Sequence, residues 1–267
     1  MSFATRLLDY KPHLEALYNR YNHKSWVHPD PLEFLYAFGQ IRDREIAGLI
    51  ASALAYGRVA QILVSTASIL DRMPFPYEFI MRNDKKRMLR TFGGFKHRFT
   101  TADDLVDFLL AVKKVLNQFG SIEACFASGL DRKAENIVPA MEKFVQALDL
   151  KREKGRFSLI PHPDRKSACK RTNLFLRWMV RKDNVDPGGW TAIDPSLLII
   201  PLDTHMHRIA LRLGLTERKQ ADLRCALEVT GSFREINPKD PTRYDFALTR
   251  LGIHPEGDMN QLLPLSD

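Results

Sequence analysis

The sequence predicts an all-α protein, and two observations support this fold class. Apolar residues recur at intervals of three and four in stretch after stretch of the chain, which is the spacing of an amphipathic helix. Strictly alternating apolar and polar segments are not found in a comparable set, and most Pro and Gly residues fall between the helical stretches. We therefore expect a set of helices joined by loops.

The helical spacing marks eight candidate helices. The first two include Ile46 to Leu54 and Ile62 to Leu70, and both are expected to face the core. The others cover residues 105–116, 137–148, 170–181, 204–213, 219–230 and 241–251.

Two segments read as connections between helices. Residues 82–98 are strongly basic and contain Gly93 and Gly94, which predicts an exposed connection, either simply solvated or touching phosphates. Residues 151–169 are rich in charge and proline and form the clearest break in the helical pattern.

Composition favours a folded protein with a polyanionic partner. Of the 267 residues 45% are hydrophobic, which is enough for a substantial core, and the formal net charge is +8. Three widely separated cysteines (Cys125, Cys169, Cys225) indicate neither a disulfide framework nor a cysteine metal site. The charged N-terminal segment does not resemble a signal peptide and no apolar run is long enough to span a bilayer, so we expect a cytoplasmic protein without membrane contact.

Asp203 is the first candidate site residue. In the segment IIPLDTHMHRIALRLGL an apolar run stops at Pro201, and a helix is predicted to start directly after Asp203. The aspartate then caps the helix through the free backbone amides, and the helix dipole favours its charged form. Capping alone accounts for an aspartate here, so a catalytic role needs further support.

Lys170 is the second candidate. It lies at the predicted start of the helix KRTNLFLRWMVRK, whose apolar residues bury one face. The positive end of a helix disfavours an ammonium, and with partial burial this favours the free amine that attack on a carbon centre requires. An ordinary surface lysine is the alternative interpretation.

Three blocks of the sequence resemble the endonuclease III branch of the helix-hairpin-helix DNA glycosylases. PLDTHMHRIALRLGL is similar to the segment that carries the catalytic aspartate of that branch, and EIAGLIASALAYGRVAQI is similar to its early helix pair. IPHPDRKSACKR resembles the hairpin before the catalytic lysine. The blocks are collinear and cover roughly residues 42–70 and 158–253. More narrowly, the chain resembles a bacterial family marked by SACKR, LFLRWMVR and PLDTH.

The resemblance implies a two-lobed helical bundle of the helix-hairpin-helix glycosylase type. Residues 1–267 would form one unit, with lobes at approximately 40–150 and at 1–39 plus 151–267 and a cleft between them. The expected function is a DNA glycosylase with AP lyase activity that flips a damaged base, 8-oxoguanine among the candidates, out of double-stranded DNA. The protein is expected to be a monomer without cofactor, metal ion or iron–sulfur cluster.

The resemblance also assigns roles to residues. Lys170 is the expected nucleophile that forms a Schiff base, and Asp203 assists it or stabilises the developing positive charge on the sugar. Leu54, Tyr56 and Arg58 are candidates for filling the gap left by the flipped base. Arg171, His205 and Arg208 are further candidates for DNA contacts.

The hairpin block departs from the family pattern. His162 and Asp164 stand where the motif usually has glycines, which predicts a reshaped or longer turn. Lys166 is the alternative nucleophile, because RKSA superposes on the RKTA of the motif. We favour Lys170 because it is expected to lie on the helix.

Two other functions remain open. Asp203, His205 and His207 suggest a metal-dependent hydrolase, although side chains two residues apart on a helix point in nearly opposite directions. A non-catalytic DNA-binding protein on a glycosylase scaffold is also consistent with the altered hairpin.

Overall fold

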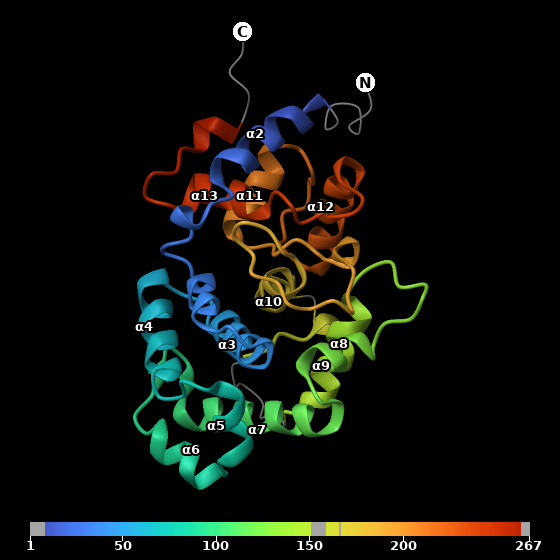
Figure 1. The fold of residues 1–267 in the computed structure, drawn as a ribbon. Helices are drawn as coiled ribbons and strands as arrows, with labels where there is room; N and C mark the ends of the chain where they lie inside the picture. The colour runs from blue at the N-terminus through green and yellow to red at the C-terminus, as the bar shows by residue number, and fades with distance from the viewer. Residues whose placement is uncertain (1–8, 151–158, 166, 263–267) are drawn as a thin grey trace.

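A computed structural model describes residues 9–150, 159–165 and 167–262. Figure 1 shows a helical protein, which confirms the predicted all-α class. The described strands are β1 (Lys96–His97) and β2 (Thr100–Thr101), which pair in antiparallel fashion as a very short hairpin. No helix in the described ranges is long and apolar enough to cross a membrane.

The helices follow one another along the chain and are joined by connections of very different lengths. Short 3-10 helices cover Lys24–Trp26, Pro31–Ala37, Pro163–Arg165, Pro195–Leu197 and Met259–Leu262. The α-helices are α2 (Lys11–Tyr21), α3 (Ile41–Ala53), α4 (Val59–Leu70), α5 (Pro76–Arg82), α6 (Lys85–Thr91), α7 (Ala102–Phe119), α8 (Ile122–Ala127), α9 (Val138–Leu148), α10 (Lys170–Val180), α11 (Thr204–Arg212), α12 (Leu223–Ile236) and α13 (Asp245–Ile253).

Polar side chains define where several helices begin. Thr101 and Asp104 form a capping box at the start of α7. Asp84, Asp203 and Asp222 each accept backbone amides at the starts of α6, α11 and α12. These caps satisfy amides that have no partner within the helix, and they explain why the helices start where they do.

The N-terminal part of the chain packs against its C-terminal part. Helix α2 lies beside α13 (Figure 1), and Nε2 of His13 is 2.8 Å from the backbone oxygen of Gln261. Arg243 also bridges to Glu15 at 3.0 Å. Further along the chain, α3 packs against α10. These contacts place α2 beside α13 and α3 beside α10. The division into two lobes remains a prediction.

The structure corrects some of the expected boundaries. Residues 82–98 are not a simple connection, because they contain α6 and the first strand of the hairpin. Helix α12 extends from Leu223 to Ile236, later than the predicted 219–230, because Asp222 caps it. Helix α13 starts at Asp245 rather than at 241, since residues 241–244 form a turn.

Candidate active site

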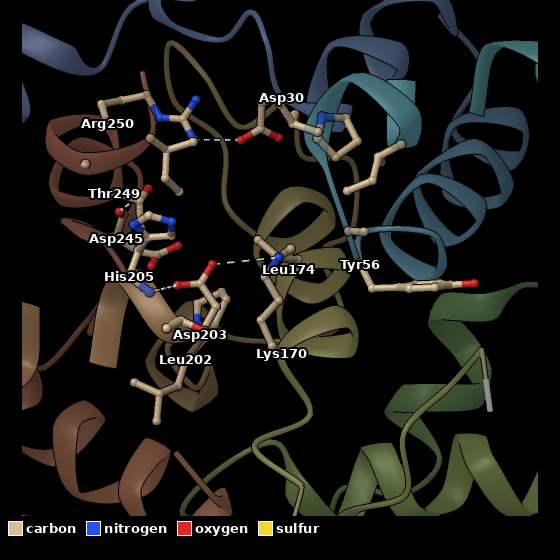
Figure 2. A pocket seen from close by; sticks show the side chains of 18 of the residues that line it. Asp30, Tyr56, Lys170, Leu174, Leu202, Asp203, His205, Asp245, Thr249 and Arg250 are labelled. Atoms are coloured by element: carbon tan, nitrogen blue, oxygen red, sulfur yellow. Dashed lines mark hydrogen bonds and ion pairs between the residues drawn. The ribbon is translucent and has the colours of Figure 1, made fainter. Parts of the chain in front are cut away.

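A cavity of about 700 Å³ lies between segments that are far apart in the sequence. Its walls come from α10, α13, the loop between α3 and α4, the segment 201–205 and residues 29–31 (Figure 2). Pockets that bind small organic groups are commonly of this size and have a few polar groups on an otherwise apolar lining. The polar side chains of this pocket include two sets, each of which contains an ion pair.

Lys170 and Asp203 form the first set. Nζ of Lys170 lies 3.9 Å from Oδ2 of Asp203, and the two side chains are 28% and 25% exposed. The structure therefore brings together the two residues that the sequence singled out. Both are accessible from the cavity, since each lines it.

The local backbone explains why both side chains face the pocket. Lys170 is the first residue of α10, directly after Cys169, whose φ of 50° turns the chain sharply. Asp203 ends an extended segment, and its Oδ1 accepts the amides of His205 and Met206, each at 2.9 Å. Because capping uses Oδ1, the other oxygen is left to face Lys170.

Asp245, Thr249 and Arg250 on α13 and Asp30 form the second set. Arg250 donates to Asp30 at 2.9 Å, and the Arg250 side chain is only 3% exposed. Asp30 belongs to the N-terminal segment, so this ion pair ties that segment to α13 beside the pocket. Figure 2 shows the pair at the end of the cavity away from Lys170.

Asp245 is a buried carboxylate with one unused oxygen. Its Oδ2 accepts from Arg177, whereas Oδ1 is buried and has no hydrogen-bond partner among the described residues. Burial raises the pKa of Asp245 to about 6, with a smaller contribution from the negative charge of Asp203, although Arg177 acts in the opposite direction. A buried acceptor without a partner is rare in folded proteins and is costly in free energy.

Arg177, a residue of α10, is held in place by a network of buried ion pairs. Its Nη2 lies 3.2 Å from Asp186, and it also binds Asp245. Arg181 binds the same Asp186 and also Asp240 at 3.0 Å. The two carboxylates raise the pKa of Arg177 despite its complete burial, so Arg177 stays charged. The network therefore fixes the orientation of Asp245 in the pocket wall.

Three residues expected at the DNA are engaged within the protein. Leu54 is 1% exposed and lies in the core, so the prediction that it fills a gap in DNA is wrong. Tyr56 lines the pocket, and its hydroxyl bonds the carbonyl of His97 at 2.9 Å and lies 2.7 Å from the Thr100 hydroxyl. Arg171 donates to the carbonyl of Ala53 at 2.9 Å and stacks over the Tyr56 ring, and burial lowers its pKa to about 10.

The remaining expected DNA contacts lie at or near the surface. Arg58, at the start of α4, and Arg208, on α11, are exposed. His205 lines the pocket between Asp203 and α13 (Figure 2). Lys166, the alternative nucleophile, lies outside the described residues.

Asp203, His205 and His207 do not gather around one point. Nε2 of His207 lies 2.8 Å from the carbonyl oxygen of Arg218, away from the Lys170–Asp203 pair. Across the described ranges, no group of three or more His, Cys, Asp and Glu side chains is arranged to hold a metal ion.

The segment before α10 contains a 3-10 turn at Pro163–Arg165. Nδ1 of His162 lies 2.5 Å from Oδ1 of Asp164 across this turn. The assignment of a helix-hairpin-helix motif remains a prediction.

Asp245, Thr249, Arg250, Arg177 and Asp30 were not identified from the sequence. One signal was available for Arg177, which interrupts the apolar run LFLRWMV. An arginine at such a position must be buried with a carboxylate partner, because an unpaired buried charge costs several kcal/mol.

The fold and the pocket define an all-α protein with a lysine–carboxylate pair in a cavity walled by buried ion pairs. The chain belongs to a family described as protein of unknown function (DUF2400), whose model matches residues 30–254. This range includes both polar sets of the pocket. No curated protein and no solved structure matches the chain.

Proposed function

We propose that this protein is a DNA-repair glycosylase with AP lyase activity, in which Lys170 is the nucleophile and Asp203 its carboxylate partner. One observation carries the proposal. A lysine at the first residue of a helix lies 3.9 Å from the carboxylate of Asp203 in a cavity of about 700 Å³. An amine next to a proton acceptor in a pocket is suited to attack on carbon.

The chemistry proceeds through a covalent intermediate. Asp203 accepts a proton from the Lys170 ammonium, and the free amine attacks C1′ of the deoxyribose. The C1′–N bond to the base breaks, and the base leaves with the electron pair and takes up a proton. Opening of the sugar ring breaks the C1′–O4′ bond, O4′ takes up the proton that Asp203 holds, and C1′ and Nζ are left joined as a Schiff base. The Asp203 carboxylate then accepts a proton from C2′, and the electron pair of that C–H bond expels the 3′ phosphate and cleaves the strand.

Charge and cavity size support a nucleic-acid substrate. The formal charge of +8 favours binding to phosphates, and exposed Arg58 follows Gly57, which lines the pocket. The sugar carbon of a stacked nucleotide is out of reach, so the nucleotide must rotate out of the duplex into the cavity. The helix-hairpin-helix type of the fold, double-stranded damaged DNA as partner and a cytoplasmic location belong to the same proposal.

Borohydride trapping tests the proposal directly. The purified protein is incubated with duplexes that contain 8-oxoguanine, an oxidised pyrimidine, uracil or an abasic site, and borohydride reduces any Schiff base to a stable adduct. We expect an adduct with the wild type and none with Lys170→Gln. Lys114→Gln is the matched control, because Lys114 also pairs with an aspartate, Asp149, at 3.0 Å, but on the surface.

The remaining variants separate the alternatives. Loss of the adduct only in Lys166→Gln would transfer the nucleophile's role to that residue. Absence of any adduct on every duplex, with DNA binding intact, would contradict the proposal and favour a non-catalytic DNA-binding protein.

A further inference from the structure

The hairpin of β1 and β2 presents an exposed aromatic ring among basic side chains. Arg98 and Phe99 form its turn, and Phe99 is 66% exposed. The Arg98 guanidinium lies over the Phe99 ring, 5.4 Å from the ring centroid. Lys96 and Arg98 are also exposed, and residues 96–100 contain no acidic side chain. The proposed chemistry uses none of these residues.

The turn has an unusual backbone for its sequence. Arg98 has a φ of 52°, which lies in the left-handed region where the turns of two-residue hairpins favour glycine, asparagine or aspartate. An arginine is strained in that region, and strained residues of this kind are found mostly at functional sites. The chain therefore keeps Arg98 beside Phe99 at some cost in stability, which favours a role beyond folding.

The hairpin is anchored to the rest of the protein by buried contacts. The His97 side chain is fully buried, with Nδ1 2.9 Å from Oγ of Ser65 on α4 and Nε2 3.2 Å from the backbone oxygen of Tyr56. The Tyr56 hydroxyl donates to the carbonyl of His97 and lies 2.7 Å from the hydroxyl of Thr100. Both strands are thus tied to the loop before α4, and the turn is held in a fixed position.

The turn lies next to residues that line the cavity. Tyr56 and Gly57 both line it, and the Arg98 side chain packs closely on Gly57. A Cβ at residue 57 would lie 2.8 Å from both Cδ and Nη1 of Arg98. Figure 2 shows the Tyr56 hydroxyl directed away from Lys170. The cavity and the hairpin therefore share one boundary, which is the loop between α3 and α4.

From this geometry we infer that the Arg98–Phe99 turn binds an unpaired nucleobase together with its phosphate. The exposed ring offers a stacking surface to the face of a base, and Lys96 and Arg98 supply the positive charge that a phosphate requires. A base inside an intact duplex is covered on both faces by its neighbours, so the ligand is single-stranded DNA. The formal charge of +8 favours this polyanion over an apolar protein surface. The inference adds a binding site to the proposed function and does not depend on the lysine chemistry.

The test compares an undamaged oligothymidylate with a fully paired duplex of the same length, and fluorescence anisotropy gives the Kd of each. We expect Phe99→Ala to weaken binding of the oligothymidylate about tenfold, which is the effect of losing one base–aromatic stack. Binding of the duplex is expected to change by about twofold or less. Phe99→Trp is expected to bind the oligothymidylate as the wild type does, because tryptophan also stacks. Phe75→Ala is the matched control, since Phe75 is 64% exposed but lies at the start of α5, outside the hairpin.

Two further measurements assign the contact to the turn. An oligothymidylate with 5-iodouracil in place of one thymine crosslinks on illumination to an aromatic ring on which that base stacks, and we expect mass spectrometry to find the crosslink at Phe99. Arg98→Ala is expected to reduce the slope of log affinity against log salt by about 0.7, the value for one phosphate of a single strand. Phe99→Ala leaves this slope unchanged, because it removes no charge. Thermal melts show whether each variant is folded.

Several results would overturn the inference. These are failure of the wild type to bind the oligothymidylate, equal losses in Phe99→Ala and Phe75→Ala, and equal losses on the oligothymidylate and the duplex. A crosslink at Tyr56 in place of Phe99 would also overturn it, because the base would then lie in the cavity. The borohydride adduct with abasic duplex DNA tests the lysine chemistry alone. Loss of that adduct would overturn the proposed function, whereas binding of the oligothymidylate would still decide whether the turn stacks on a base.

Discussion

Asp203 serves two groups at once: one carboxylate oxygen caps α11, and the other lies 3.9 Å from Nζ of Lys170. The same side chain therefore has a structural and a proposed chemical role. An amide in its place retains an oxygen for the cap but loses the negative charge. This difference allows the two roles to be measured separately.

We expect Asp203→Asn to abolish borohydride trapping while leaving the free energy of unfolding within about 0.5 kcal/mol of wild type, because asparagine caps helices as well as aspartate does. Asp203→Ala loses the cap as well and is expected to cost about 1 kcal/mol. Urea unfolding gives the stabilities. The control is Asp222→Asn, since Asp222 caps α12 through the Cys225 amide at 2.9 Å and does not line the pocket. Full trapping by Asp203→Asn would remove the carboxylate from the mechanism.

The buried network behind the pocket leads to a second prediction. Arg177→Met leaves the negative charges of Asp186 and Asp245 buried with less positive charge beside them. We therefore expect the free energy of unfolding to fall by about 3 to 5 kcal/mol. Arg82→Met serves as the control, because Arg82 pairs with Glu78 at 2.6 Å while 77% exposed. An exposed pair contributes less than about 1 kcal/mol. Urea unfolding measures both losses. Equal losses of unfolding free energy in Arg177→Met and Arg82→Met would show that the Arg177 network stabilises the fold no more than an exposed ion pair does.

The helical core was predictable because its signal is local. The predicted stretch 105–116 falls within α7, and 137–148 matches α9 to within one residue, since a helix with one buried face repeats its apolar residues every three or four positions. Helix α6 was not predicted, because its sequence KKRMLRT buries Met88 alone. The cap at Asp84 was the available signal.

The candidate site was predictable in part. Asp203 follows from the end of an apolar run before a helix, and Lys170 from the resemblance together with the helix start. Leu54 was misplaced because α3 is buried on all sides from Glu45 to Ala53, so the residue that follows it also points into the core. The position of Asp245 depends on how α13 packs near α10, and no pattern within either helix contains that information.

Glu45 leads to a prediction about pH. It is 1% exposed, and burial raises its pKa to about 7 from an ordinary 4.5, although the amides of Ile122 and Glu123 and the Trp190 indole oppose this. Between pH 4.5 and 7 the folded state therefore holds a proton that the unfolded state has lost. Glu45 thus favours folding at low pH, and this contribution is lost as the pH rises through that window.

Relative to Glu45→Gln, which cannot titrate, the wild type is expected to lose about 3 kcal/mol of stability between pH 4.5 and 7. Urea unfolding of both proteins at half-unit intervals measures the difference. Glu33→Gln is the control, because the Glu33 carboxylate lies near the surface, 2.8 Å from His28. Parallel curves for wild type and Glu45→Gln would show that Glu45 has the same proton affinity in both states.

The exposed arginines near the pocket allow a final prediction about DNA binding. If Arg58 and Arg208 each neutralise one phosphate, Arg58→Ala and Arg208→Ala weaken binding to any duplex sequence. Each also reduces the slope of log affinity against log salt by about 0.9, because each contact releases condensed counterions. Fluorescence anisotropy across a salt series measures both quantities.

Arg132→Ala is the control, since Arg132 is exposed in the connection between α8 and α9, which does not line the pocket. A slope that falls equally in all three variants would indicate binding through general charge, and an unchanged slope in Arg58→Ala and Arg208→Ala would place the DNA on another face of the protein.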